Sequence, residues 1–217
     1  MPHIDENLMT DVKKVLATVE NDVSLILFTS EEDCTYCSET QELIGEIAEL
    51  SDHLNLEVRD IDASREVAEH FGVDKAPALV VMGEQDHGIR FYGIPAGFEF
   101  GTLLEVIRLV SQDDPELNED VKEKLALLKE PVHLQVFVTP TCPYCPPSVV
   151  AAHKLAMASD LVTADMVEAS EFPELSQKHM VMSVPKTVAN SDAGIDGAMP
   201  EGQLIDWILA EANGRPA

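Results

Sequence analysis

The chain has 217 residues, of which 45% are hydrophobic, and its 14 Lys and Arg against 40 Asp and Glu give a formal net charge of −26. This balance argues against nucleic acid as a partner, because binding to a phosphate backbone requires clusters of Lys and Arg and the sequence has none. No apolar run reaches the roughly 18 to 20 residues of a membrane-spanning helix, so no membrane association is expected. The start of the chain, Met1 to Glu6, lacks the basic and apolar segments of a secretory signal, and we therefore expect a cytoplasmic protein.

The first half of the chain is predicted to alternate helices and strands. Apolar positions at helical spacing from Leu8 to Val19 predict an opening helix, and an apolar run over Leu25 to Thr29 predicts a strand. This strand leads into Cys34-Thr35-Tyr36-Cys37, which opens a helix expected over Cys34 to Leu50. The remaining elements are a strand (Leu54 to Ile61), a short helix (Ser64 to Phe71), a strand after Pro77 and an amphipathic helix (Phe100 to Val110).

The second half is predicted to repeat this order. The stretch Ser111 to Pro131 connects the halves, and its apolar residues from Leu117 to Leu128 have helical spacing, which predicts the opening helix of the second half. A strand over Val132 to Val138 leads into Cys142-Pro143-Tyr144-Cys145. The elements that follow are a helix (Cys142 to Ala158), a strand (Leu161 to Val167), a short helix (Pro173 to His179), a strand after Pro185 and a last helix (Gly202 to Ala210).

An offset of 108 residues, about half the chain, relates the unusual residues of the two halves. It carries both cysteines of the first pair onto the second pair, Tyr36 onto Tyr144 and Pro77 onto Pro185. A period of this length argues for two copies of one domain. We expect an N-terminal domain over residues 1–112 and a C-terminal domain over 113–217, and strands that alternate with helices imply a mixed sheet covered on both faces in each.

All four cysteines lie in the two Cys-x-x-Cys motifs. No cysteine remains to form a separate structural disulfide, as expected in a reducing compartment. Two such pairs can form a tetrahedral Cys₄ zinc site, which is the alternative to redox chemistry. The 105 positions between Cys37 and Cys142 weigh against a compact zinc ribbon, whose pairs are separated by roughly 15 to 20 residues.

Each half resembles a thioredoxin fold, with a strand, a Cys-x-x-Cys motif at a helix start and a proline 40 residues after the second cysteine. The whole chain is similar to the protein disulfide oxidoreductases of archaea and thermophilic bacteria, also called glutaredoxin-like proteins. The resemblance implies an α/β fold of two tandem thioredoxin-like domains, each a central mixed sheet flanked by helices. It also implies that Pro77 and Pro185 are cis, so that Ala76 and Val184 present backbone groups to a substrate segment.

The spacing of the cysteines suits disulfide exchange. Residues i and i+3 of a helical turn lie close enough to form a disulfide, so each pair can close on itself. Cys34 and Cys142 are assigned as nucleophiles, because a helix N-terminus stabilises the thiolate that attacks a disulfide. Cys37 and Cys145, one turn further on and less exposed, would resolve the mixed disulfide.

The two sites differ in charge. The first carries five acidic residues and no basic one, whereas Thr139 to Val150 around the second carries no charge. Neighbouring carboxylates oppose thiolate formation, so we expect Cys142 to be the more reactive nucleophile, unless those acids point into solvent and are screened. The acids of the first site are Glu31, Glu32, Asp33, Glu39 and Glu42.

Two further features of the second site have alternative interpretations. Pro146 and Pro147 lack the N–H groups of a regular helix interior, so the helix either starts irregularly or kinks, or it simply starts later than Cys142. Met180 and Met182 are interpreted as core or strand residues, with a soft apolar rim for substrates as the alternative.

These features predict a cytoplasmic thiol–disulfide oxidoreductase that reduces protein disulfides, and could also form or isomerise them, with the Cys142–Cys145 site dominant. No bound cofactor is expected. The resemblance implies a thioredoxin reductase-like flavoprotein as electron donor and a peroxiredoxin as a disulfide-containing acceptor. The first alternative is an electron relay like the tandem N-terminal domain of the alkyl hydroperoxide reductase flavoprotein, although that domain retains only the second cysteine pair. The distant alternative is the zinc-binding structural protein.

Overall fold

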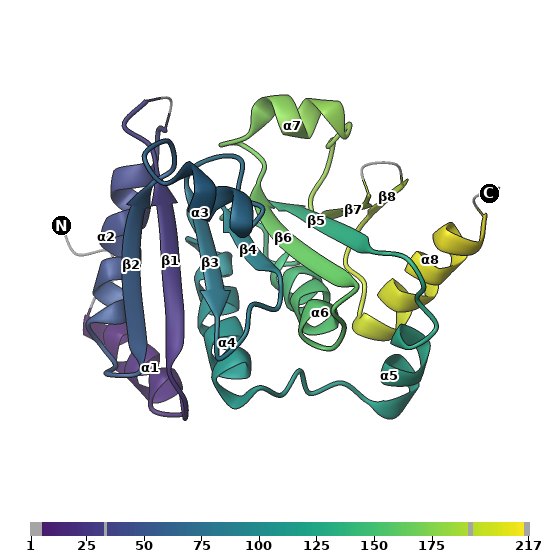
Figure 1. Cartoon of the computed structure of the whole chain (residues 1–217), viewed down its shortest axis with the longest axis horizontal. Helices are drawn as coiled ribbons and strands as arrows, with labels where there is room; N and C mark the ends of the chain where they lie inside the picture. The colour runs from purple at the N-terminus through teal and green to yellow at the C-terminus, as the bar shows by residue number, and fades with distance from the viewer. Residues whose placement is uncertain (1–5, 33, 191–192, 215–217) are drawn as a thin grey trace.

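The computed structural model describes residues 6–32, 34–190 and 193–214. Within them, the two halves contain the same series of strands and helices, as the sequence repeat predicts (Figure 1). The first half comprises α1 (Glu6–Leu16), β1 (Val23–Thr29), α2 (Cys37–Ala48), β2 (Leu54–Asp60), α3 (Arg65–His70), β3 (Ala78–Met82), β4 (Ile89–Tyr92) and α4 (Phe98–Gln112). The second half comprises α5 (Glu119–Leu125), β5 (Val132–Val138), α6 (Pro146–Met157), β6 (Val162–Glu168), α7 (Pro173–Lys178), β7 (Lys186–Ala189), β8 (Ala193–Asp196) and α8 (Glu201–Gly214).

The strands of both halves form one continuous sheet in the order β2-β1-β3-β4-β6-β5-β7-β8. In each half the first two strands are parallel, and the third and fourth extend the sheet antiparallel to their neighbours. The halves join through a parallel pairing of β4 with β6, in which Ile89 opposes Ala164 and Tyr92 opposes Val167. The α/β class and the mixed strand order of each half are confirmed, whereas the fusion of the two sheets is not visible in the sequence pattern.

This topology brings both cysteine motifs to the same edge of the sheet. Strand β1 runs parallel to β4, because β3 is antiparallel to both, and β4, β6 and β5 are mutually parallel. The motifs follow β1 and β5, so they share the carboxyl edge. Four strand-to-strand steps separate β1 from β5, which corresponds to about 19 Å along the sheet. The two disulfides are therefore too far apart for direct exchange, in which sulfur atoms must touch.

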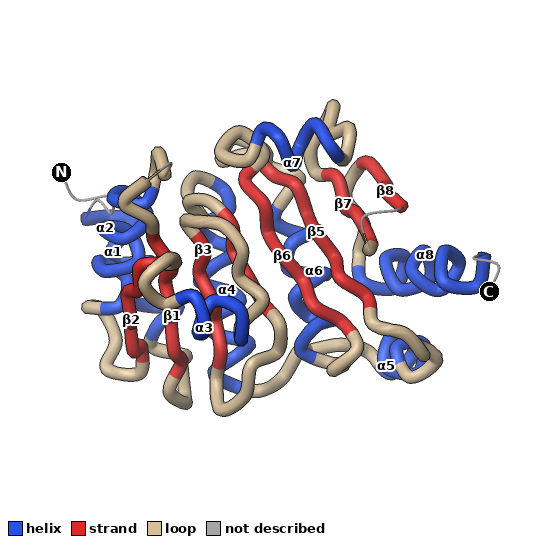
Figure 2. The backbone as a smooth tube through the Cα atoms, turned by 45° about the horizontal axis from the view of Figure 1, so that its top comes forward, coloured by secondary structure: helices blue, strands red, loops and turns tan. Residues whose placement is uncertain are grey.

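Apolar side chains on both faces of the sheet hold the helices. Along β1, Leu25 and Leu27 belong to one apolar cluster with α1, α2 and α4, and the intervening Ile26 and Phe28 belong to a second cluster with α3. This alternation follows from the two-residue period of a strand. The first cluster continues under α5, α6 and α8, and α3 and α7 cover the opposite face (Figure 2). Each fully buried Leu or Phe stabilises the fold by about 1.5 to 3 kcal/mol before entropy costs.

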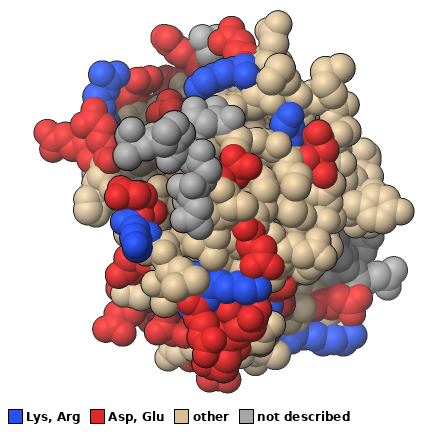
Figure 3. Space-filling view, turned by 90° about the vertical axis from the view of Figure 1, so that its right-hand side faces the viewer, with Lys and Arg blue, Asp and Glu red and all other residues tan. Residues whose placement is uncertain are grey.

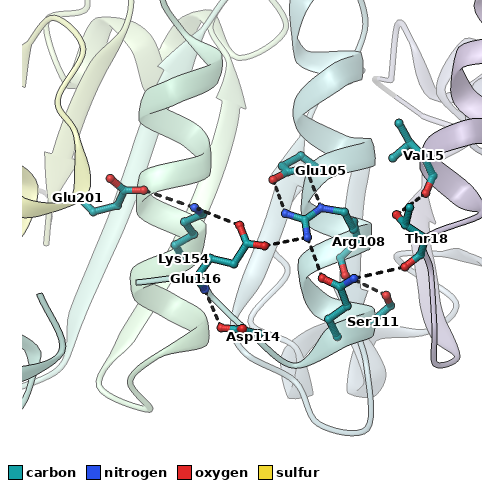
Figure 4. A network of polar contacts seen from close by, with 10 residues as sticks. Val15, Thr18, Glu105, Arg108, Ser111, Asp114, Glu116, Lys154 and Glu201 are labelled. Atoms are coloured by element: carbon teal, nitrogen blue, oxygen red, sulfur yellow. Dashed lines mark hydrogen bonds and ion pairs between the residues drawn. The ribbon is translucent and has the colours of Figure 1, made fainter. Parts of the chain in front are cut away.

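An ion network fixes the connection between the halves. On α4, the Arg108 guanidinium donates to Glu105 at 2.7 Å and to Glu116 of the connection at 2.9 Å. The same Glu116 carboxylate lies 4.0 Å from the Lys154 ammonium of α6, which also pairs with Glu201 of α8 at 3.6 Å (Figure 4). The connection is thus tied to both halves, and its predicted helix is present as α5.

The charge of the chain is visible on its surface. The face at the β8 edge carries many more acidic than basic side chains, and the acidic ones gather most densely toward the end of the molecule where α5 lies (Figure 3). In the part of the chain that the structure describes, no helix has the length and apolar content to cross a membrane.

Candidate redox sites

Both cysteine pairs are closed as disulfides. Cys34 is bonded to Cys37 and Cys142 to Cys145, with Cα atoms 5.5 Å apart in each pair. A zinc cage would need all four sulfurs together, and the structure instead pairs them two by two at separate places on the sheet edge. Among the described residues, no group of three or more His, Cys, Asp or Glu side chains is arranged to hold a metal ion.

The helices after the cysteines begin later than the sequence pattern predicts. Helix α2 starts at Cys37 rather than Cys34, and α6 starts at Pro146 rather than Cys142. Proline suits the first helical positions, where no N–H bond is required, so Pro146 and Pro147 delay the start of α6 and do not kink it. The first cysteine of each pair therefore lies in the loop that precedes the helix N-terminus.

The two cysteines of each pair differ in access. Cys37 is buried and accepts a hydrogen bond from the Ser30 backbone N–H, with a nitrogen–sulfur distance of 3.3 Å. Cys145 is fully buried. Cys34 is half-buried, whereas only 7% of Cys142 is exposed. The second cysteine of each pair is the less accessible one, as the sequence analysis expects of a resolving residue.

The proline loops lie where the resemblance places them. The Ala76–Pro77 and Val184–Pro185 peptide bonds are both cis, which confirms the expectation. At the second site, the Cys142 sulfur lies 3.8 Å from the Val184 carbonyl oxygen. At the first site, Ala76 and Pro77 line a cavity together with Thr35 of the cysteine motif. Each disulfide thus has the residues before and at the proline as neighbours.

The cavity at the first site has a volume of about 590 Å³ and is lined by residues of both halves. Glu171 and Phe172, which follow β6, complete its wall. The acidic side chains near this site that the sequence analysis singled out are exposed, in agreement with the alternative that they point into solvent: Glu31, Glu32, Glu39 and Glu42. Asp33 lies outside the described residues.

The second site has an apolar rim. Tyr144 within the cysteine motif is 72% exposed, and Met180 and Met182, just before the proline loop, are 73% and 91% exposed. Phe98 of the first half is also exposed, and its backbone N–H donates to the Pro140 carbonyl at 3.0 Å, two residues before Cys142. The interpretation of the two methionines as core or strand residues is wrong, because they lie between α7 and β7 and outside the sheet.

A buried carboxyl group lies beside the second site and was missed by the sequence analysis. Glu99, in the first turn of α4, is 1% exposed, and neither carboxyl oxygen has a hydrogen-bond partner among the described residues. Burial raises the pKa of Glu99 to about 7, against a smaller opposing effect of the neighbouring Thr102 hydroxyl, whose geometry falls short of a hydrogen bond. The preceding turn touches the second site closely, because Gly97 has φ +62° and an added Cβ would lie 2.1 Å from the Pro140 oxygen. The available signal was the spacing of Glu99 with Leu103 and Val106, which puts it on the buried face of a helix.

Comparisons with known proteins agree with this geometry. A thioredoxin domain model matches residues 132–210. A protein disulfide oxidoreductase from Aeropyrum pernix superposes with a TM-score of 0.89 at 31% identity, covering 98% of this chain and 95% of that one. The N-terminal domain of the alkyl hydroperoxide reductase AhpF from Enterococcus faecalis gives a TM-score of 0.87 at 27% identity, covering 94% and 99%.

A curated relative matches over most of this chain but is much longer. The AhpF component of the alkyl hydroperoxide reductase of Staphylococcus epidermidis is 28% identical over 202 residues. The match covers 93% of this chain, which spans only 37% of the length of that relative.

Proposed function

The chain belongs to the protein disulfide oxidoreductases with two tandem thioredoxin-like folds, and on this basis we propose that it reduces protein disulfides in the cytoplasm by dithiol exchange at two sites. The Cys142–Cys145 site is the dominant one. The observation that carries the proposal is the contact of the Cys142 sulfur with the Val184 carbonyl oxygen inside an exposed apolar rim. An extended substrate segment that pairs with the backbone at Val184 would bring its own disulfide to Cys142.

The reaction at this site proceeds in two exchanges. The Cys142 thiolate attacks one sulfur of the substrate disulfide, the substrate S–S bond breaks, and a mixed disulfide forms while one substrate thiolate leaves. Cys145 then loses its proton and attacks the Cys142 sulfur, which closes the enzyme disulfide and releases the second substrate thiol. The substrate gains two electrons and the enzyme loses two, which an external dithiol or a flavoprotein reductase must resupply.

Neighbouring groups assist these steps. The N-terminal end of α6 follows the motif directly, and its dipole favours a thiolate at Cys142, whereas Pro146 and Pro147 leave the first two helical positions without N–H groups. Glu99 follows the turn that contacts Pro140, and its pKa of about 7 lets it hold or release a proton near neutrality. We assign to Cys34 and Cys37 the same roles at the first site, and to Ala76 the backbone role of Val184.

The proposed division into domains at residues 112 and 113 is supported by the end of α4 at Gln112 and by the repeated order of elements on either side. Each domain then carries one disulfide and one proline loop, and both face the same edge of the sheet.

Trapping the mixed disulfide tests the proposed reaction. The full-length Cys145→Ser variant, reduced and mixed with an oxidised peptide disulfide, should accumulate a covalent adduct on Cys142, because the resolving thiol is missing. The matched Cys142→Ser variant should form no adduct at the second site. Mass spectrometry of the trapped peptide identifies the cysteine. Adducts on Cys145 in the Cys142→Ser variant, or none in either variant, would contradict the assigned roles.

An electron relay between a flavoprotein reductase and a peroxiredoxin is the second candidate, because the match to the alkyl hydroperoxide reductase of Staphylococcus epidermidis covers 93% of this chain. The two functions are separated by their acceptors. A relay should pass electrons to a peroxiredoxin disulfide much faster than to an unrelated disulfide such as that of insulin, whereas a general reductase should reduce both. Thioredoxin reductase with NADPH serves as the electron source in both assays.

A further inference from the structure

The first redox site receives a side chain from the other half of the molecule. Glu171 lies after β6 in the second half, and its carboxylate accepts a hydrogen bond from the Ile94 backbone N–H in the first half, with a nitrogen–oxygen distance of 2.6 Å. The neighbouring residue Gly93 donates its N–H to the carbonyl oxygen of Pro77 at 3.0 Å. Two hydrogen bonds and one short turn therefore connect Glu171 to the proline loop of the first site.

The turn at Gly93 is built around this carboxylate. Gly93 has φ +89°, which favours glycine, and an added Cβ would lie 2.6 Å from the Glu168 Cβ and 2.8 Å from a Glu171 carboxylate oxygen. Only glycine lets the chain pass this close to Glu171. Both the positive φ and the close approach therefore favour glycine at position 93.

The repeat shows that the carboxylate is particular to the second half. The offset of 108 residues places Ala63 where the second half has Glu171. The local turn is the same in both, because the Ala63 N–H donates to Asp60 at 2.8 Å and the Glu171 N–H donates to Glu168 at 2.6 Å. Ala63 follows β2, the outermost strand at the edge of the sheet far from β5, and its methyl group cannot accept a hydrogen bond, so the second site receives no equivalent contact.

The same side chain faces the cavity where substrate would bind. Glu171 and Phe172 line the cavity of about 590 Å³ with Thr35, Ala76 and Pro77. The ring of Phe172 packs edge-on against Tyr92, which anchors this wall to the first half.

The electrostatic surroundings make the contact sensitive to pH near neutrality. Burial together with the charges of Glu168 and Glu39, the latter on α2 of the first site, raises the pKa of Glu171 to about 7, although the Ile94 bond favours the carboxylate. Six further charged side chains line the same cavity and face this group: Glu32, Asp62, Arg65, Glu69, Asp74 and Lys75.

We propose that Glu171 is a positioning residue of the first redox site: by binding the Ile94 N–H it holds the turn that fixes Pro77, so the second half of the chain sets the substrate affinity of the Cys34–Cys37 site. This inference rests on the proposed disulfide reductase function and deepens it. The first site is then completed by both halves.

Kinetics of single-site variants test the proposal. In a full-length chain with Cys142 and Cys145 changed to Ser, Glu171→Ala should raise the KM for a peptide disulfide about 3- to 10-fold, the effect of losing one net hydrogen bond, and leave kcat nearly unchanged. Glu171→Gln keeps an oxygen that can accept the Ile94 bond, so it should restore the KM and abolish its pH dependence around neutrality. The matched control is Glu174→Ala, an exposed carboxylate of the same segment, which should have no effect.

Two results would overturn the proposal. One is an unchanged KM at the first site in Glu171→Ala. The other is an equal rise in KM at the second site, measured with Cys34 and Cys37 changed to Ser, because a loss shared by both sites reflects general destabilisation.

Amide hydrogen exchange separates failure of this proposal from failure of the reductase function. If no variant, nor the wild type, reduces any disulfide, the proposed function fails, and the role of Glu171 is judged from exchange at Ile94 and Gly93. Glu171→Ala should speed exchange at both amides, and Glu171→Gln at neither. Faster exchange at Ile94 alone would show that Glu171 does not hold the turn onto Pro77.

Discussion

Replacing Glu99 by Gln should change how the stability of the protein depends on pH. The pKa of this carboxyl rises from the ordinary value of 4.5 to about 7 on folding, because the group is buried. Between these values the folded state keeps a proton that the unfolded state has released. The free energy of unfolding of the wild type therefore falls as pH rises through this interval. One pKa unit corresponds to about 1.4 kcal/mol, so the charged form of Glu99 costs about 3 kcal/mol above pH 7.

The variant removes this titration but keeps the shape of the side chain. The buried amide of Gln has its own desolvation cost, which does not change with pH and so cancels when pH values are compared. The free energy of unfolding of Glu99→Gln minus that of the wild type should increase by about 3 kcal/mol between about pH 4 and about pH 9. Urea unfolding of both oxidised proteins across this range measures the difference.

Glu105→Gln on the same helix is the matched control and should give the opposite sign. The hydrogen bond from Arg108 lowers the pKa of Glu105 despite partial burial. This carboxylate stabilises the folded state above its unfolded pKa, and the stabilisation is lost as pH falls. The variant should therefore lose stability relative to wild type at neutral pH and recover it in acid. Parallel curves for Glu99→Gln and wild type would refute the assignment of Glu99 as a buried titrating group.

Four more substitutions, one of them a control, have expected outcomes. Gly97→Ala should destabilise the protein by about 1 to 3 kcal/mol in urea unfolding, because its Cβ would meet the Pro140 oxygen at 2.1 Å; Gly101→Ala on the same helix has open space and should stabilise by up to about 1 kcal/mol. Equal effects of the two changes would contradict the close contact. Met182→Ser should raise the KM of the second site for a peptide disulfide about 3-fold without lowering kcat, since this exposed methionine would bury apolar surface against a bound substrate; no change would remove it from the apolar rim. Arg108→Ala should lower the melting temperature, most strongly at low salt, because two carboxylates lose their partner; a salt-independent loss would indicate packing instead.

The sequence was sufficient to predict the order of elements and the residues at the redox sites, because both depend on local patterns. Alternation, helical spacing and the 108-residue offset locate each strand and helix, and the offset pairs the two Cys-x-x-Cys motifs. The delayed start of α6 was open, because proline after Cys145 is compatible with either a late start or a kink. In the structure, α6 begins at Pro146, which agrees with the late start.

Features that depend on contacts between the halves could not be predicted. The pairing of β4 with β6 joins an edge strand of one half to an edge strand of the other, and no single-strand pattern encodes the partner. The hydrogen bond of Glu171 to Ile94 joins residues of different halves, and the burial of Glu99 arises only in the folded molecule. The exposure of Met182 was misjudged because apolar character predicts burial on average and does not identify an apolar side chain on an exposed loop.

Disulfide reductase activity of the two single-site proteins, measured with insulin and dithiothreitol, tests the central claim most directly. The chain with Cys34 and Cys37 changed to Ser should retain most of the wild-type rate, because the second site keeps a motif segment without charged residues, Thr139 to Val150, and its apolar rim. The chain with Cys142 and Cys145 changed to Ser should retain only a minor part. Equal rates for the two proteins, or a faster rate for the chain that keeps only the half-buried Cys34, would contradict the account.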